Sequence, residues 1–145
     1  MDHPPTSVLV FGGGIMGCGI AAGFAAQGGR VTLLVREAAR IDSAAQQCEA
    51  LLQSLQPAPG ASAIAVQAMD DFKGWDGLGL VIESITEDLA LKQALFAGLD
   101  ARVPAGVPIG SNSSSHGISR IAAGLSTRSR MFNMHYFMPA HRVPL

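Results

Sequence analysis

The residues best suited to chemistry lie in two short stretches in the second half of the chain. His135 follows an apolar run that begins at Met131, and a serine-rich segment, SNSSSHG, occupies 111–117. Histidine accepts or donates a proton near neutral pH, and hydride transfer to or from an alcohol needs such a partner. The combination suggests proton transfer by His135 beside a loop of hydroxyl groups.

Simpler interpretations of these residues stay open. His135 could cap the end of a strand, and at least one serine of 113–115 is expected to cap the helix that follows. His116 and His141 are interpreted as exposed loop residues. The histidines and carboxylates show no zinc-like spacing, so no metal site is predicted.

The first third of the chain contains a glycine pattern between predicted elements. Four apolar residues, 8–11, predict a strand, GGGIMGCG follows, and a helix is predicted as far as Gln27. In a G-x-G-x-x-G turn the first glycine permits the tight turn, the second lets a pyrophosphate approach, and the third allows close helix packing. The helix start offers free N–H groups to the phosphates. The predicted dinucleotide contacts are Gly12, Gly14, Ile15, Met16 and Gly17, and the alternative is a glycine-rich turn without a ligand.

The end of the second predicted strand, 31–35, bears on which dinucleotide is bound. Enzymes that use NAD usually have an acidic residue there for the ribose hydroxyls. This chain has Val35 followed by Arg36, with Arg40 one helical turn on. An arginine suits a 2′-phosphate through charge-assisted hydrogen bonds, so Arg36 favours NADP over NAD. The alternative is a surface arginine, with Glu37 binding the ribose.

Strand-like and helical patterns alternate along the chain. This alternation predicts an α/β fold with a doubly wound parallel sheet (the Rossmann fold), six strands and the order 3-2-1-4-5-6. The loops after strands one, four, five and six then open on one edge of the sheet, where ligands gather. The predicted strands are 7–11, 31–35, 63–66, 78–82, 107–110 and 131–137, and the predicted helices are 15–27, 37–55, 87–99 and 118–125.

Composition narrows the class of protein. The chain has 145 residues, enough for one domain, and its 48% apolar and 14% charged residues fit a sheet buried on both faces. With a net charge of -1 and no long basic run, neither a nucleic acid nor an anionic membrane is an expected partner. No apolar run reaches the ~18 residues of a membrane span. The start, MDHPPTS, does not fit a signal peptide, and Cys18 and Cys48 are too few for a disulfide framework, so a cytoplasmic location is expected.

Four blocks of the sequence carry a resemblance to a known family. They are VFGGGIMGCGIA at 10–21, VIESITEDLALKQALFAGLD at 81–100, SNSSS at 111–115 and MHYFMPAHRVPL at 134–145. With them the chain resembles the amino-terminal NAD(P)-binding domain of the L-3-hydroxyacyl-CoA dehydrogenases and their relatives, the L-gulonate 3-dehydrogenase and carnitine dehydrogenase group. The blocks after residue 80 are far more specific than the glycine motif.

The resemblance implies NAD(P)-dependent oxidation of a small-molecule substrate, a 3-hydroxyacyl-CoA or a 3-hydroxy acid, to the 3-keto product by hydride transfer. It implies that His135 takes the proton of the 3-hydroxyl group and that Ser114 orients the oxygen. The predicted cofactor-binding set also includes Ser84, Glu87, Lys92 and Asn112 from these blocks.

The chain also departs from the family. The family's second, helical domain is absent, so residues 1–145 are expected to be a dinucleotide-binding domain fragment that binds the cofactor but turns over poorly, from a full-length form that is a homodimer. The family's histidine-orienting glutamate is absent as well. A short connection between the second and fourth strands, and Met138 in place of an asparagine, make a smaller 3-hydroxy acid as plausible as an acyl-CoA. The alternative function is a non-catalytic dinucleotide-binding or sensing module.

Overall fold

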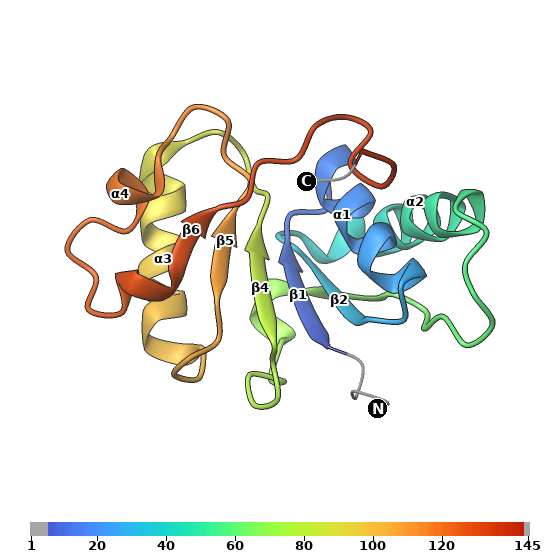
Figure 1. Cartoon of the computed structure of the whole chain (residues 1–145), viewed down its shortest axis with the longest axis horizontal. Coiled ribbons are helices and arrows are strands. Elements are labelled where there is room, and N and C mark those ends of the chain that lie inside the picture. The colour runs from blue at the N-terminus through green and yellow to red at the C-terminus, as the bar shows by residue number, and fades with distance from the viewer. Residues whose placement is uncertain (1–5, 144–145) are drawn as a thin grey trace.

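The computed structural model describes residues 6–143, which form one six-stranded parallel sheet with helices around it (Figure 1). The strand order, β3-β2-β1-β4-β5-β6, confirms the predicted doubly wound fold. The predicted strand, helix and site residues all fall within the described range, whereas residues 1–5 of the MDHPPTS start and the terminal residues 144–145 of the last block lie outside it. The strands are β1 (Ser7–Phe11), β2 (Arg30–Val35), β3 (Ala65–Ala68), β4 (Leu80–Glu83), β5 (Ile109–Ser111) and β6 (Met131–Asn133). The helices are α1 (Ile15–Ala26), α2 (Ile41–Ser54), α3 (Leu89–Arg102) and α4 (Ile118–Ile121), with 3-10 turns at Ala38–Arg40, Met69–Asp71 and Arg128–Arg130.

Both faces of the sheet are buried. Side chains alternate between the faces along a strand, so the central strand β1 contributes to two apolar clusters. Val8 and Val10 belong to the cluster that includes residues of α1 and α2. Leu9 and Phe11 belong to the cluster that includes residues of α3 and α4. In Figure 1, α1 and α2 accordingly group beside β1 and β2, and α3 and α4 beside β5 and β6.

Several predicted boundaries are wrong by a few residues. The helix α4 ends at Ile121 instead of 125, because the chain turns and Gly124 adopts a positive φ of 77°. The strand β6 ends at Asn133 instead of 137, because the N–H of Tyr136 bonds to a side chain instead of a strand. The helix α2 starts at Ile41, after a 3-10 turn, and β3 lies two residues later than predicted.

The glycine turn between β1 and α1 depends on two close backbone approaches. Gly12 has a φ of 109°, and a Cβ atom there would overlap the Ser84 carbonyl group. A Cβ atom on Gly17 would overlap the Gly12 carbonyl oxygen. Gly14 has open space around it, with no atom within 4 Å of the Cβ position. The close backbone contacts of the turn therefore require glycine at Gly12 and Gly17. Gly14 instead leaves open space beside the start of α1.

The C-terminal segment, residues 134–143, leaves β6 and crosses to α1. Figure 1 shows it arching over that helix. The helix accommodates it with small residues, since a Cβ atom on Gly19 would lie 3.2 Å from the Cβ atom of Ala140, and one on Gly23 would lie 3.9 Å from the Cα atom of His141. The candidate residue His135 thus lies at the start of a segment that is anchored at both ends. Within residues 6–143, none of the helices combines the length and apolar character needed to cross a membrane.

Replacing Gly17 with alanine is expected to destabilise the fold by about 3 kcal/mol or more, because the methyl group would overlap a backbone oxygen that cannot rotate away. Gly14→Ala is the matched control, since its φ of -81° suits alanine and the space is open, and it should cost about 1 kcal/mol or less. Chemical denaturation measures both changes. Equal losses in the two variants would contradict this role of Gly17.

Candidate active site

The loops at the carboxyl ends of the central strands are joined by backbone hydrogen bonds that continue the sheet. Three N–H groups donate to the neighbouring strand, each at 2.8 Å: Ser84 to Phe11, Asn112 to Glu83, and Met134 to Ser111. These bonds bring the loops after β1, β4, β5 and β6 to one edge of the sheet, as the sequence predicts.

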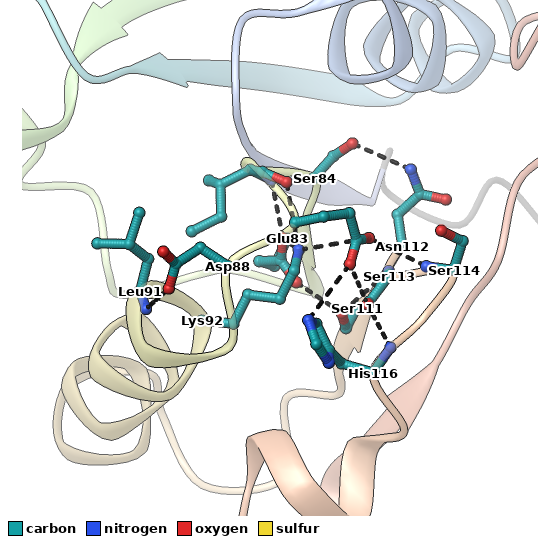
Figure 2. A network of polar contacts seen from close by, with 12 residues as sticks. Glu83, Ser84, Asp88, Leu91, Lys92, Ser111, Asn112, Ser113, Ser114 and His116 are labelled. Carbon is teal, nitrogen blue, oxygen red and sulfur yellow. Dashed lines mark hydrogen bonds and ion pairs between the residues drawn. The ribbon is translucent and has the colours of Figure 1, made fainter.

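Glu83 ends β4 and is the buried centre of this edge (Figure 2). The Lys92 ammonium group donates to its Oε1 atom at 2.6 Å, and the N–H of Ile85 donates to the same atom at 2.8 Å. The Ser111 hydroxyl donates to its Oε2 atom at 2.5 Å. A buried charge is tolerated only when it is paired and its remaining sites are hydrogen-bonded, and Glu83 meets both conditions. The carboxylate therefore ties β4, α3 and β5 together beneath the loops.

Lys92 is in the core rather than at the surface where a cofactor would lie. Its side chain is 1% exposed, and its ammonium group also donates to the Ile85 carbonyl at 3.2 Å. The same group lies 4.0 Å from Oε1 of Glu87. Its position is therefore below the loop, between the two carboxylates.

Glu87 holds the serine loop. The hydroxyls of Ser113 and Ser115 donate to its Oε2 atom, each at 2.9 Å, and the N–H of Ser114 donates to its Oε1 atom at 3.0 Å. Burial raises the pKa of Glu87, but the hydrogen bonds from the three serines and the charge of Lys92 outweigh that effect, so the pKa lies below its usual value. The carboxylate therefore stays ionised and keeps the loop attached to the end of β4.

The expectation that a serine caps the next helix is wrong. The helix α4 begins at Ile118, and its first N–H donates to the Asn133 side chain at 2.7 Å. Ser113 instead accepts a hydrogen bond from the His116 N–H at 3.0 Å, within the loop. The hydroxyls of Ser113 and Ser115 donate to Glu87 instead of lying at the helix end.

Two further histidines are less exposed than expected. The side chain of His116 is only 19% exposed, and its Nε2 atom lies 3.8 Å from Oε2 of Glu87. His141 is half-buried, where the C-terminal segment lies against α1. Neither residue is the freely exposed loop residue that the sequence suggested.

The two predicted catalytic residues are both exposed, at the ends of neighbouring strands. Ser114 lies three residues beyond β5, and His135 lies two residues beyond β6. The His135 ring packs against Phe137, with ring centroids 4.8 Å apart. The backbone on either side of His135 is held, because Met134 bonds to Ser111 and the N–H of Tyr136 donates to Asn112 at 2.8 Å.

The other predicted cofactor residues differ in exposure. Gly14, Ile15 and Arg36 are exposed, on the glycine turn and just beyond β2, whereas Gly12 and Met16 are half-buried and Gly17 is buried. Ser84 and Asn112 instead bond to each other, at 3.1 Å between the asparagine Nδ2 and the serine Oγ atoms. Sequence reasoning did not single out Glu83, although a carboxylate at the end of an apolar run was a usable signal, and nothing in the sequence marked Asn133.

The two cysteines and the histidines add no further site among residues 6–143. Cys18 and Cys48 are free and buried, and both belong to the apolar cluster that includes α1 and α2. No group of three or more histidine, cysteine or acidic side chains in this part of the chain could hold a metal ion.

Comparison with known proteins identifies the family. The family described as "3-hydroxyacyl-CoA dehydrogenase, NAD binding domain" matches residues 7–145. The chain belongs to this family. The match confirms the resemblance that the four sequence blocks carry. The fold agrees with it, and so does the NAD-binding character expected of the domain.

Individual relatives are longer than this chain. The alpha subunit of the fatty acid oxidation complex of Acinetobacter baylyi is 32% identical over 153 residues, which cover 99% of this chain and 21% of the subunit. Among solved structures, M. tuberculosis FadB2 is 29% identical with a TM-score of 0.82, covering 94% of this chain and 51% of that one. The 3-hydroxybutyryl-CoA dehydrogenase of Escherichia coli K12 is 30% identical with a TM-score of 0.73, covering 95% and 31%. The chain thus spans about half or less of the length of these relatives.

Removing the cation of the buried pair should be costly. Lys92→Met leaves the Glu83 carboxylate buried without its partner, which is expected to destabilise the fold by about 3–5 kcal/mol. The double variant Glu83→Gln/Lys92→Met removes both charges and should recover part of that loss. Urea denaturation compares the two variants. A single variant as stable as the unaltered chain would show that the pair does not hold this edge.

The Glu87 tether should depend on pH. Because the pKa of Glu87 in the folded chain is below its ordinary value of 4.5, the tether stabilises fully above that pH and weakens as the pH falls through the lower, folded value. Glu87→Gln should therefore lower the melting temperature at neutral pH, and the gap to the unaltered chain should narrow as the pH falls below 4.5. Hydrogen bonds from Thr127 and Ser126 also lower the pKa of Asp100. Because Asp100 is present in both proteins, its own pH dependence cancels in the comparison. A gap that is independent of pH would contradict the tether.

Proposed function

We propose that this chain is the dinucleotide-binding part of an NAD(P)-dependent dehydrogenase that oxidises a 3-hydroxyacyl-CoA or a 3-hydroxy acid to the 3-keto product. The observation that carries the proposal is the pairing of two exposed groups, Ser114 and His135, at the ends of adjacent strands, on loops tied down by buried or bonded neighbours. Membership of the family, and a neighbour named as a 3-hydroxybutyryl-CoA dehydrogenase, support the same reaction.

The glycine turn fits a dinucleotide. The helix α1 begins after Gly14, has no side chain bonded across its N-terminus and has no acidic residue in its first turn. Its free N–H groups and positive dipole end therefore face an open space that suits a pyrophosphate. Gly12, Gly14, Ile15, Met16 and Gly17 would contact it, and Arg36 would lie toward the adenosine ribose.

The proposed chemistry gives His135 and Ser114 separate tasks. When bound, a nicotinamide supplies the acceptor for the hydride that leaves C3 of the substrate. His135 takes the proton of the 3-hydroxyl group, and the Ser114 hydroxyl orients that oxygen. Glu87 fixes the backbone of Ser114 by accepting a hydrogen bond from its N–H group. Because this bond does not use the Ser114 hydroxyl, the hydroxyl stays available to the substrate. Lys92 supports both carboxylates from below.

Substrate size and assembly remain part of the proposal. The connection between β2 and β4 contains one α-helix, α2, together with the short strand β3 and two 3-10 turns, which offers little structure for holding a CoA moiety. Met138 is 65% exposed next to the site and adds apolar surface. With these two features, a small 3-hydroxy acid is as good a candidate substrate as an acyl-CoA. We also propose that the longer protein is cytoplasmic and forms a homodimer.

His135→Gln tests the proposed catalytic role. The chain is assayed with 3-hydroxybutyryl-CoA and with free 3-hydroxybutyrate, using NAD and NADP, under conditions sensitive to slow turnover. Losing the proton acceptor should lower kcat by about 10²–10⁴-fold and leave the Kd for NADH within about twofold. If both proteins bind the cofactor but the variant oxidises the substrates at the same rate as the unaltered chain, the non-catalytic dinucleotide-binding module would be favoured instead.

Arg36→Ala tests the cofactor preference. The exposed guanidinium at the end of β2 should bind a 2′-phosphate, so NADPH should bind more tightly than NADH and the variant should reduce that preference by about tenfold. Arg30, exposed at the opposite end of β2, provides the control Arg30→Ala, which should not change the preference. Fluorescence titration measures the affinities of the unaltered chain and the two variants for NADH and NADPH. Equal or reversed preference in the unaltered chain would reject the NADP assignment and favour Glu37 as the ribose ligand.

A further inference from the structure

Two asparagines at the ends of neighbouring strands each bond to the segment that follows the other strand. Asn112, after β5, accepts a hydrogen bond from the N–H of Tyr136 at 2.8 Å, in the segment after β6. Asn133, at the end of β6, accepts one from the N–H of Ile118 at 2.7 Å and donates to the carbonyl of His116 at 3.2 Å, both in the segment after β5. The arrangement is reciprocal.

The chemistry of the partners fixes the orientation of both amides. The N–H groups of Tyr136 and Ile118 can only donate, so they must meet the Oδ1 atoms. The carbonyl of His116 can only accept, so it must meet the Nδ2 atom of Asn133. The Nδ2 atom of Asn112 then donates to the Ser84 hydroxyl, which links the pair to β4. Each amide therefore uses its donor and its acceptor, and each has only one favourable orientation.

These bonds act on the backbone beside the two residues proposed to do chemistry. Tyr136 follows His135 directly, and His116 is two residues from Ser114. Beyond β6 the side chains of Phe137 and Met138 are 63% and 65% exposed, whereas Tyr136 and Ala140 are buried in the apolar cluster that includes α1. The Tyr136 bond to Asn112 therefore acts together with the burial of the Tyr136 ring, and it is a polar restraint that links the backbone beside His135 to the serine loop.

We propose that Asn112 and Asn133 form a reciprocal clamp that sets the distance between His135 and Ser114. Both are positioning residues, since they act through the backbone of other residues, and the catalytic consequence rests on the proposed function above. Asn112 then has a different task from the cofactor contact expected from the sequence. Because a shift of about 1 Å at a reacting group can cost about a hundredfold in rate, a clamp of this kind matters more for kcat than for cofactor affinity.

The test combines hydrogen exchange with kinetics on the intact chain. In Asn112→Ala, amide exchange at Tyr136 should accelerate by about tenfold or more, as expected for a broken hydrogen bond, and in Asn133→Ala the same should occur at Ile118. In each variant kcat should fall by about tenfold or more, while KM and the Kd for NADH stay within about twofold. Asn112→Asp keeps the acceptor for the Tyr136 N–H, so it should restore exchange protection and most of the lost kcat.

A matched control separates the clamp from general loosening. Gln93→Ala removes an exposed side chain that donates to the carbonyl of Arg120 at 2.9 Å, a bond of the same kind that reaches α4 and not the strand ends. It should leave kcat unchanged. Unaltered exchange at Tyr136 in Asn112→Ala would overturn the clamp. Faster exchange with unaltered kcat would overturn its positioning role. Absence of hydride transfer in the unaltered chain with any tested substrate would overturn the proposed function and the catalytic half of this proposal, while the exchange rates still decide whether the clamp exists.

Discussion

The buried pair of Glu83, at the end of the central strand β4, and Lys92 is the interaction on which this edge of the sheet depends. Glu83 is 0% exposed and meets Lys92, Ser111 and the Ile85 N–H, so one charge joins a helix and two strands. Burying a charge is unfavourable unless its sites are filled, and the requirement to fill them fixes the relative positions of the three elements. The loops that carry Glu87 and the serines are built on this base.

Above that base, the exposed polar groups are held mainly through backbone N–H groups. Glu87 binds the N–H of Ser114, and Asn112 binds the N–H of Tyr136, beside His135. Fixing the backbone in this way leaves the hydroxyl and the imidazole themselves available. A site organised like this suits a reaction in which two side chains must meet a substrate that lies across them.

The fold was predictable from the sequence because its signals are local. Apolar runs bounded by glycines marked the strands, and the turn glycines Gly12 and Gly17 are required by close backbone contacts that any helix entering at this angle would make. The early end of α4 comes with the turn at Gly124, which a helical pattern did not reveal. The end of β6 was not predictable, because a side chain from another segment, Asn112, takes the N–H of Tyr136. The same reason explains Lys92: its sequence block suggested a place beside the cofactor, whereas pairing with Glu83 draws it into the core.

We propose that the nicotinamide end of a bound dinucleotide lies at the ends of β5 and β6, beside His135. The most direct measurement is a nuclear Overhauser experiment on the chain saturated with NADH, observing contacts from the C4 protons of the nicotinamide. The structure predicts cross-peaks to the ring protons of His135 and to the β-protons of Ser114. Bound NADH whose C4 protons show contacts only to residues elsewhere in the chain would contradict the claim.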